Sequence, residues 1–190
     1  MIIYLHGFGS HGNAKKANMF REYFRSIGVG FIAPTLSYIP KLAIDTLSEI
    51  IDVCDDDIYL IGSSLGGYYS TYLSNNKKVK KVILINPAVK SPSTLKKALN
   101  RGICYYDNSE FEFTTQHIEY LKSIEPPHID EQKFMVFLQK GDEVLDYRDA
   151  KNRYKNSKLI IQNGGNHSFE NIQNHFDTIR EFFGISALGI

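Results

Sequence analysis

The sequence has few cysteines and no excess of charge of one sign. Its two cysteines, Cys54 and Cys104, are far apart and form no CxxC pair, which argues against a disulfide framework or a zinc ribbon and favours reduced, buried thiols. The 22 lysines and arginines nearly balance the 21 acidic residues, so no global field concentrates nucleic acid or anionic lipid at the surface. We therefore expect no nucleic-acid partner.

The first residues also lack the features of a targeting segment. They are apolar, but no basic stretch precedes them and a glycine-rich loop follows at once. This pattern favours neither a signal peptide nor a transmembrane helix, and it predicts a cytoplasmic protein without a membrane span. A chain of 190 residues is long enough for one domain around a single core.

Short runs rich in Ile, Val, Leu and Phe recur along the chain without the alternation of half-exposed strands. They begin at residues 2, 31, 58, 82, 134 and 158. Strands that are apolar on both sides belong in a sheet covered on both faces. Helical periodicity lies between them, at 20–27, 44–51 and 169–183. This order predicts an α/β fold with a doubly wound, mostly parallel sheet of about six strands and helices on both faces.

One connection is far longer than a crossover helix requires. Residues 87–132 separate two of the expected strands, and long connections inside compact domains are usually functional or mobile. We expect a short helical cap inserted in a single domain that spans 1–190. Four aromatic residues of this segment either line an acyl pocket or pack in the core: Tyr105, Tyr106, Phe111 and Phe113.

A serine follows the third of these runs in the order G-x-S-x-G. The letters "GSSLGG" place Gly62, Ser64 and Gly66 between a buried strand and a helix that begins near Leu65. That is the setting of a nucleophile elbow, in which a sharp turn raises the serine hydroxyl above the sheet and small residues let strand and helix approach. The neighbouring Ser63 is expected to point away and do no chemistry.

A serine hydroxyl needs a base to remove its proton, and histidine suits this at neutral pH. His167 lies directly after the last strand and before the last helix, for which Ser168 can serve as N-cap. His6 also follows a strand but is better explained as holding the first loop by hydrogen bonds. The simpler interpretation of three others, as surface or core residues, is preferred: His117, His128 and His175.

The imidazole needs a carboxylate for its other N–H. The stretch "GDEVLDY" offers Asp142, Glu143 and Asp146 after the fifth strand. Asp142 is the first of them, whereas Asp146 precedes a helical stretch and is explained as its N-cap. A further acidic run at 55–57 precedes its strand, so it predicts a solvated turn at the wrong end of the sheet rather than a metal site. We expect no metal and no cofactor.

The chain resembles the α/β-hydrolase superfamily, and most closely the small bacterial esterases of the YqiA type. The resemblance covers nearly the whole chain, through "YLHGFGS", "IGSSLGGYY", "INPA", "QKGDEVLDY" and "GGNHSF". It implies hydrolysis of carboxylic esters, or of thioesters, of small acyl substrates through an acyl-enzyme. Ser64 would be the nucleophile, His167 the base and Asp142 the residue that orients it. The larger members begin with two further strands that this chain lacks.

The loop "HGFGSHG" at 6–12 also has the G-x-G-x-x-G spacing of dinucleotide-binding folds. A nucleotide-binding oxidoreductase would want an acidic residue after the second strand, and "FIAPTLSYIP" offers none. We therefore interpret Gly7 to Gly9 as an oxyanion loop, with the N–H groups of Phe8 and Leu65 aimed at the developing oxyanion. Gly12 then completes the spacing by coincidence. A catalytically silent hydrolase fold used for binding is the remaining alternative.

Overall fold

The computed structural model describes residues 1–186 and contains a six-stranded, wholly parallel sheet in the order β2–β1–β3–β4–β7–β8. The α/β fold class expected from the sequence is confirmed. Strand β1 pairs with β2 on one side and with β3 on the other, so the winding of the chain reverses between β1 and β3. The strands are β1 (Ile2–Leu5), β2 (Phe31–Ile32), β3 (Ile58–Ser63), β4 (Val79–Ile85), β7 (Phe134–Gln139) and β8 (Lys158–Gln162).

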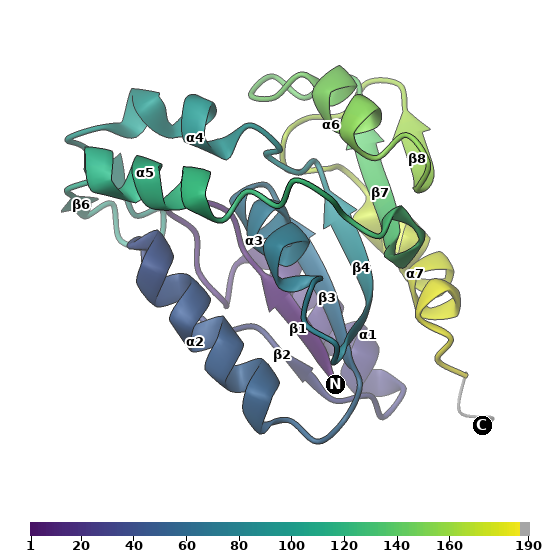
Figure 1. The fold of residues 1–190 in the computed structure, drawn as a ribbon. Helices are drawn as coiled ribbons and strands as arrows, with labels where there is room; N and C mark the ends of the chain where they lie inside the picture. The colour runs from purple at the N-terminus through teal and green to yellow at the C-terminus, as the bar shows by residue number, and fades with distance from the viewer. Residues whose placement is uncertain (187–190) are drawn as a thin grey trace.

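Helices cover both faces of this sheet (Figure 1). Apolar residues of α1 (Lys15–Ser26) and α7 (Phe176–Phe183) pack on one face. Residues of α2 (Pro40–Val53), α3 (Leu65–Leu73) and α6 (Tyr147–Arg153) pack on the other. Each strand between two helical layers is therefore apolar on both sides, which is why the sequence shows continuous apolar runs.

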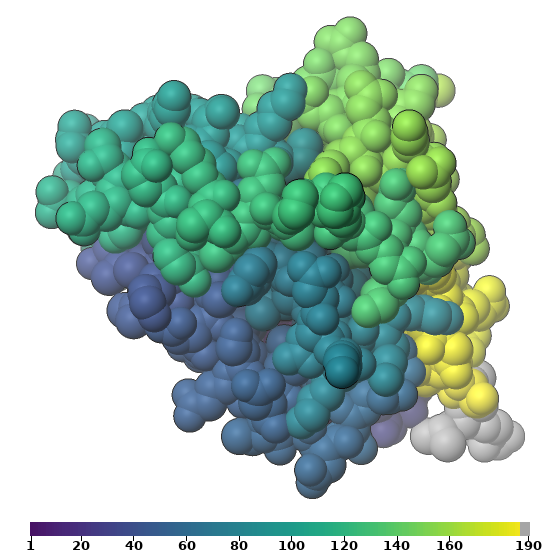
Figure 2. Space-filling view, in the orientation of Figure 1, coloured from purple at the N-terminus to yellow at the C-terminus, as the bar shows by residue number. Residues whose placement is uncertain are grey.

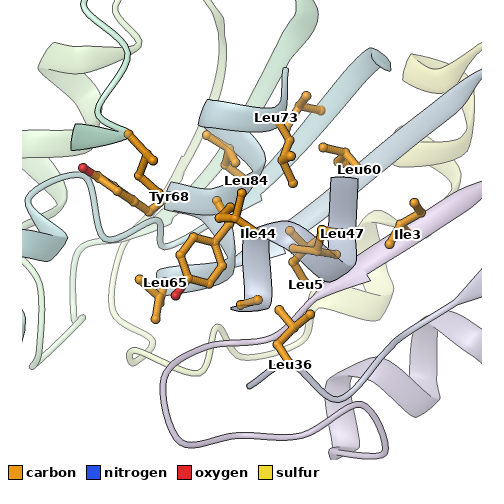
Figure 3. Packing of buried hydrophobic residues seen from close by; sticks show 14 of the residues in the cluster. Ile3, Leu5, Leu36, Ile44, Leu47, Leu60, Leu65, Tyr68, Leu73 and Leu84 are labelled. Carbon is orange, nitrogen blue, oxygen red and sulfur yellow. The ribbon is translucent and has the colours of Figure 1, made fainter. Parts of the chain in front are cut away.

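Alternation along β1 illustrates how the two cores are divided. Ile3 and Leu5 belong to the core beneath α2 and α3, while Ile2 and Tyr4 belong to the core beneath α1 and α7. Figure 3 shows Ile3 and Leu5 close to Leu47 of α2. All four β1 side chains are buried, so the strand that leads into the first loop is held firmly on both sides.

The segment between β4 and β7 crosses above the carboxyl ends of the strands. It forms a teal-to-green band along the upper part of the molecule (Figure 2). Besides the expected helices it contains a small antiparallel hairpin of two-residue strands, too short to leave a period-2 pattern in the sequence. Its elements are α4 (Ser91–Thr94), η1 (Leu95–Ala98), β5 (Gly102–Ile103), β6 (Glu110–Phe111), α5 (Thr115–Ser123) and η2 (Glu131–Lys133).

The last helix begins later than its apolar periodicity predicts. Phe169 has a left-handed backbone (φ +62°), and a 3₁₀ turn η3 (Ile172–His175) precedes α7. Ser168 therefore does not cap the helix, and His175 is its N-cap residue rather than an interior one. The expectation of helix from 169 was wrong because Phe169 is buried from a loop and Ile172 from the 3₁₀ turn, so their spacing does not reflect an α-helix.

The two cysteines are free thiols, but both are partly exposed. The expectation that they are buried was wrong because each lies outside the regular elements, Cys54 just after α2 and Cys104 just after β5. None of the helices in the described part of the chain is long and apolar enough to cross a membrane.

Candidate active site

Ser64 sits at a strained turn between β3 and α3. Its backbone has φ +54° and ψ −119°, a conformation that non-glycine residues adopt at a cost of roughly 1–3 kcal/mol. The turn requires glycine on both sides. A Cβ on Gly62 would lie 2.4 Å from the Gly66 carbonyl oxygen, and one on Gly66 would lie 2.0 Å from the Leu5 carbonyl oxygen. The G-x-S-x-G spacing thus follows from backbone contact between strand and helix.

Ser64, His167 and Asp142 form a continuous hydrogen-bonded chain. His167 Nε2 lies 3.0 Å from Ser64 Oγ. On the other side of the ring, His167 Nδ1 lies 2.9 Å from Asp142 Oδ2 and 3.0 Å from Asp142 Oδ1. With Nδ1 donating to the carboxylate, Nε2 is left free to accept the serine proton.

Asp142 is held as an anion in a nearly closed site. Its side chain is only 2% exposed. Burial by itself raises the pKa of Asp142, but the hydrogen bonds from His167 and from the N–H groups of Leu145 and Val144 outweigh burial and leave the pKa below its ordinary value. A buried carboxylate that stays ionised is suited to stabilising an imidazolium.

The other two carboxylates of this stretch have different places. Glu143 Oε2 accepts the backbone N–H of His167 at 3.0 Å. Asp146 accepts the N–H of Arg148 at 2.9 Å and caps α6, which confirms the expected N-cap. Of the three acidic residues that the sequence offered, the structure therefore brings Asp142 alone to the imidazole ring.

Two buried amides hold the loop that carries His167, and sequence reasoning missed both. Asn86, just after β4, donates from Nδ2 to the carbonyl oxygens of Asn166 at 3.0 Å and His167 at 3.1 Å. Gln139, at the end of β7, accepts the N–H of Asn166 at 3.1 Å and that of Glu170 at 2.9 Å. The Gln139 N–H in turn donates to Asn86 Oδ1 at 3.0 Å. Both lie at or just after the carboxyl end of a strand, which is where ligands bind in sheets of this kind.

The loop after β1 is fixed by His6. Its ring Nε2 accepts the N–H of Leu36 at 2.8 Å, so Nδ1 carries the proton and donates to the Gly7 carbonyl oxygen, also at 2.8 Å. Burial lowers the pKa of His6, which favours this neutral form. The turn that follows is closed by Ser10 N–H to Gly7 O at 3.2 Å, with Gly9 at φ +67°.

Two backbone donors without a partner among residues 1–186 lie near the serine, one on the loop after β1 and one at the start of α3. Gly7 lies so close that a Cβ on it would be 3.2 Å from Ser64 Cβ. Among the hydrogen bonds formed within residues 1–186, none is donated by the N–H of Phe8 or of Leu65. Leu65 is the first residue of α3, where the partial positive charge of the helix adds to that of the N–H. An anionic oxygen next to Ser64 could accept hydrogen bonds from both N–H groups.

A cavity of about 860 Å³ opens over Ser64 and His167, and a second of about 540 Å³ lies across the first loop. The Phe8 ring contacts both cavities and packs edge-on against Phe111 and Phe113. The four aromatic residues of the long connection divide accordingly. Phe113 is core, Tyr105 lines the first cavity, and two line the second: Tyr106 and Phe111.

Ser63 points to the α1 face of the sheet, where it has a partner that the sequence did not suggest. Lys16 Nζ donates to Ser63 Oγ at 2.8 Å, and both residues line the larger cavity. A lysine in an amphipathic helix ordinarily faces solvent, so no pattern marks this one.

The remaining candidates have structural explanations. Gly12 is required by packing, since a Cβ on it would lie 2.1 Å from the Ala33 carbonyl oxygen, a reason unconnected with nucleotide binding. The acidic run 55–57 is exposed at the opposite end of β3 from Ser64. His117 caps α5 with Thr114, and His128 is exposed. Within 1–186 no group of three or more His, Cys, Asp or Glu side chains could hold a metal ion.

Comparison with known families matches nearly the whole chain. Residues 1–184 match Uncharacterised protein family (UPF0227). The chain belongs to this family. A UPF0227 protein of Vibrio parahaemolyticus is 28% identical over 188 residues, which covers 96% of this chain and 98% of the relative. A UPF0227 protein of Citrobacter koseri is 24% identical with the same coverage.

Solved structures share the fold at low sequence identity. A putative hydrolase of Agrobacterium vitis has a TM-score of 0.78 at 18% identity, covering 95% of this chain and 87% of that one. The mouse alpha/beta hydrolase domain-containing protein 10 has a TM-score of 0.74 at 20% identity, covering 96% and 89%. Est1E of Butyrivibrio proteoclasticus with ferulic acid bound has 0.73 at 17%, covering 96% and 87%. The fold is thus that of the α/β-hydrolase superfamily, as the sequence resemblance implied.

Proposed function

We propose that this protein is a serine hydrolase that cleaves carboxylic esters or thioesters of small acyl substrates. The observation that carries the proposal is the chain Ser64 Oγ, His167 and Asp142, with separations of 3.0 Å and 2.9 Å at the two ring nitrogens. The strained backbone of Ser64 supports it further, because such strain costs stability and clusters at functional sites.

The chemistry follows from the positions of these groups. Ser64 Oγ attacks the substrate carbonyl carbon while His167 Nε2 takes the hydroxyl proton. The carbonyl oxygen becomes an oxyanion and accepts the N–H groups of Phe8 and Leu65. His167 then protonates the leaving alcohol or thiol, and an acyl ester remains on Ser64. Water, deprotonated by the same imidazole, then attacks that ester. The imidazolium returns the proton to Ser64 Oγ as the acid leaves, and Asp142 stabilises the imidazolium in both steps.

Two other functions are less well supported. A dinucleotide would need the backbone at Gly12, but its N–H already donates to Thr35 Oγ1 at 3.0 Å and the Ala33 carbonyl lies against its Cα. A catalytically silent binding module would have no need for an imidazole bonded at both nitrogens. The cytoplasmic location stays a prediction of the sequence.

Hydrolysis of aryl esters of increasing acyl length tests the proposal. The wild-type protein should hydrolyse at least the shorter ones, and Ser64→Ala should lose on the order of 10⁴-fold in turnover, because the three residues act as a unit. The serine is small and partly exposed, so the variant should keep the circular dichroism spectrum and urea midpoint of the wild type. Equal turnover by both proteins would refute the assignment.

A further inference from the structure

The larger cavity has a positively charged wall beside the proposed nucleophile. Lys16 extends from the first turn of α1 toward the carboxyl end of β3, where its Nζ donates to Ser63 Oγ at 2.8 Å. Ser63 directly precedes Ser64 in the chain. The ammonium group is thus placed one residue away from the reacting centre, within the same cavity.

This ammonium group has no carboxylate partner among residues 1–186. Lys16 takes part in none of the ion pairs formed there, and its hydrogen-bond acceptor is a neutral hydroxyl. Burial lowers the pKa of Lys16 to about 8 despite attraction from Asp142, whose carboxylate is already occupied by His167. A partly buried cation without a counter-charge is costly, and an anionic ligand would supply one.

The surroundings of Lys16 add to the positive potential. Lys15 and Lys97 line the same cavity, against the single acidic side chain of Glu170, which accepts Asn166 Nδ2 at 2.8 Å. The first turn of α1 contains no acidic residue, and no side chain caps it, so the partial positive charge at the helix start is not neutralised locally.

The cavity wall also contains apolar side chains. They belong to residues of the segments that follow β4 and β7, namely Ala88, Leu95, Val144 and Leu145. The cavity lining therefore combines apolar side chains with the ammonium groups of lysines, and it also contains Ser64 and His167. Such a lining suits a substrate with a hydrocarbon part and a charged part.

We propose that Lys16 is a specificity-determining residue that binds a second, anionic group of the substrate, a free carboxylate or a phosphate, while the ester carbonyl lies at Ser64. The inference rests on the proposed function and defines its substrate class as acidic esters. Lys16 contributes a charge-assisted hydrogen bond to this group, and takes no part in the bond-making steps.

Matched esters test the inference. We would measure kcat/KM for phenyl heptanoate, which is neutral, for phenyl hydrogen adipate, with a carboxylate on the acyl side, and for 3-carboxyphenyl heptanoate, with one on the alcohol side. Lys16→Met should lower kcat/KM for at least one acidic ester about tenfold or more relative to the neutral ester. Lys16→Arg should keep most of the preference, and the exposed-site control Lys155→Met should leave it unchanged.

A purely structural role of Lys16 would lower kcat/KM for all three esters by the same factor, and that result would overturn the inference.

Calorimetry on Ser64→Ala measures anion binding without hydrolysis. Adipate and inorganic phosphate are the two probes, and they distinguish a carboxylate site from a phosphate site. We expect one of them to bind and the added Lys16→Met change to abolish binding. Lys16-dependent binding without hydrolysis of any ester would refute the proposed function alone. Hydrolysis without a Lys16-dependent preference or anion binding would refute the inference alone.

Discussion

Asn86 and His167 are joined by a hydrogen bond from the buried Nδ2 of the first to the backbone carbonyl oxygen of the second, at 3.1 Å. The bond ties the end of β4 to the loop that carries the proposed base. Because Asn86 Oδ1 also accepts the N–H of Gln139, one amide links the ends of β4 and β7 to the histidine loop. The position of the imidazole thus depends on a side chain that does not touch it.

Asn86→Asp should therefore lower turnover while the fold persists. The variant keeps an acceptor for Gln139 N–H but replaces the donor to the His167 carbonyl with an oxygen that repels it. We expect a loss of about 1–3 kcal/mol in unfolding free energy and roughly tenfold to 100-fold in kcat. Urea denaturation and ester kinetics measure the two. Asn152→Asp, on the exposed side of α6, is the control, and unchanged kcat in Asn86→Asp would argue against a positioning role.

Phe8→Pro tests the first oxyanion donor. The substitution removes the backbone N–H, so turnover should fall roughly 100-fold or more with a smaller change in KM. Phe8→Leu keeps the N–H and alters only the side chain that lines both cavities, so it should mainly change KM. Equal effects of the two substitutions on kcat would mean that the N–H contributes nothing.

The paired substitutions Asp142→Asn and Asp146→Ala separate the two aspartates that follow β7. Asp142→Asn should lower turnover roughly 10³- to 10⁴-fold, because an amide leaves the imidazole in the wrong tautomer. Asp146→Ala should instead lower the urea midpoint through the lost cap of α6 and leave activity nearly unchanged. The opposite outcome, with Asp146→Ala inactive, would reassign the acid without affecting Ser64 or His167.

Lys16 should make stability depend on pH in a definite direction. Its pKa is lowered by burial to about 8 in the folded protein, against 10.5 for the free side chain. Well below pH 8 both states are protonated, and the folded state bears the full cost of the buried charge, roughly 3 kcal/mol. As pH rises from 8 to 10.5, the folded state loses its proton first and the cost disappears.

Unfolding free energies of wild type and Lys16→Met at pH 7 and pH 10.5 measure this effect. The variant should be the more stable protein at pH 7, and its advantage should shrink by about that amount at pH 10.5. The same titrations of Tyr4 and the other lysines occur in both proteins and cancel in the difference. A difference independent of pH would mean that Lys16 has an ordinary pKa.

The sequence was sufficient to predict the sheet and the residues that meet at its edge. Buried parallel strands leave long apolar runs, and the rule that ligands bind at strand ends selected Ser64, Asp142 and His167 from many alternatives, three residues that the structure brings into contact. Their chemical roles stay predictions. Asn86 and Gln139 satisfy the same rule, and applying it to amides as well as ionisable groups would have found them.

Features that depend on contacts between distant segments were not predictable. The partly buried position of Lys16 arises because its ammonium group contacts Ser63 at the end of β3, 47 residues later in the chain. The late start of α7 follows from the left-handed backbone conformation of Phe169, which a phenylalanine does not predict. The β5–β6 hairpin is held by a bond from Tyr105 N–H to Gly9 O at 2.7 Å, a contact between the long connection and the first loop.

The central claim, that Ser64 is an activated nucleophile, is tested most directly by reaction with a fluorophosphonate probe followed by peptide mapping. The account predicts a single covalent adduct on Ser64, no adduct in Ser64→Ala, and retained labelling in Ser63→Ala, whose hydroxyl serves Lys16 instead. Failure of the folded wild-type protein to react, or an adduct on Ser63 in place of Ser64, would contradict it.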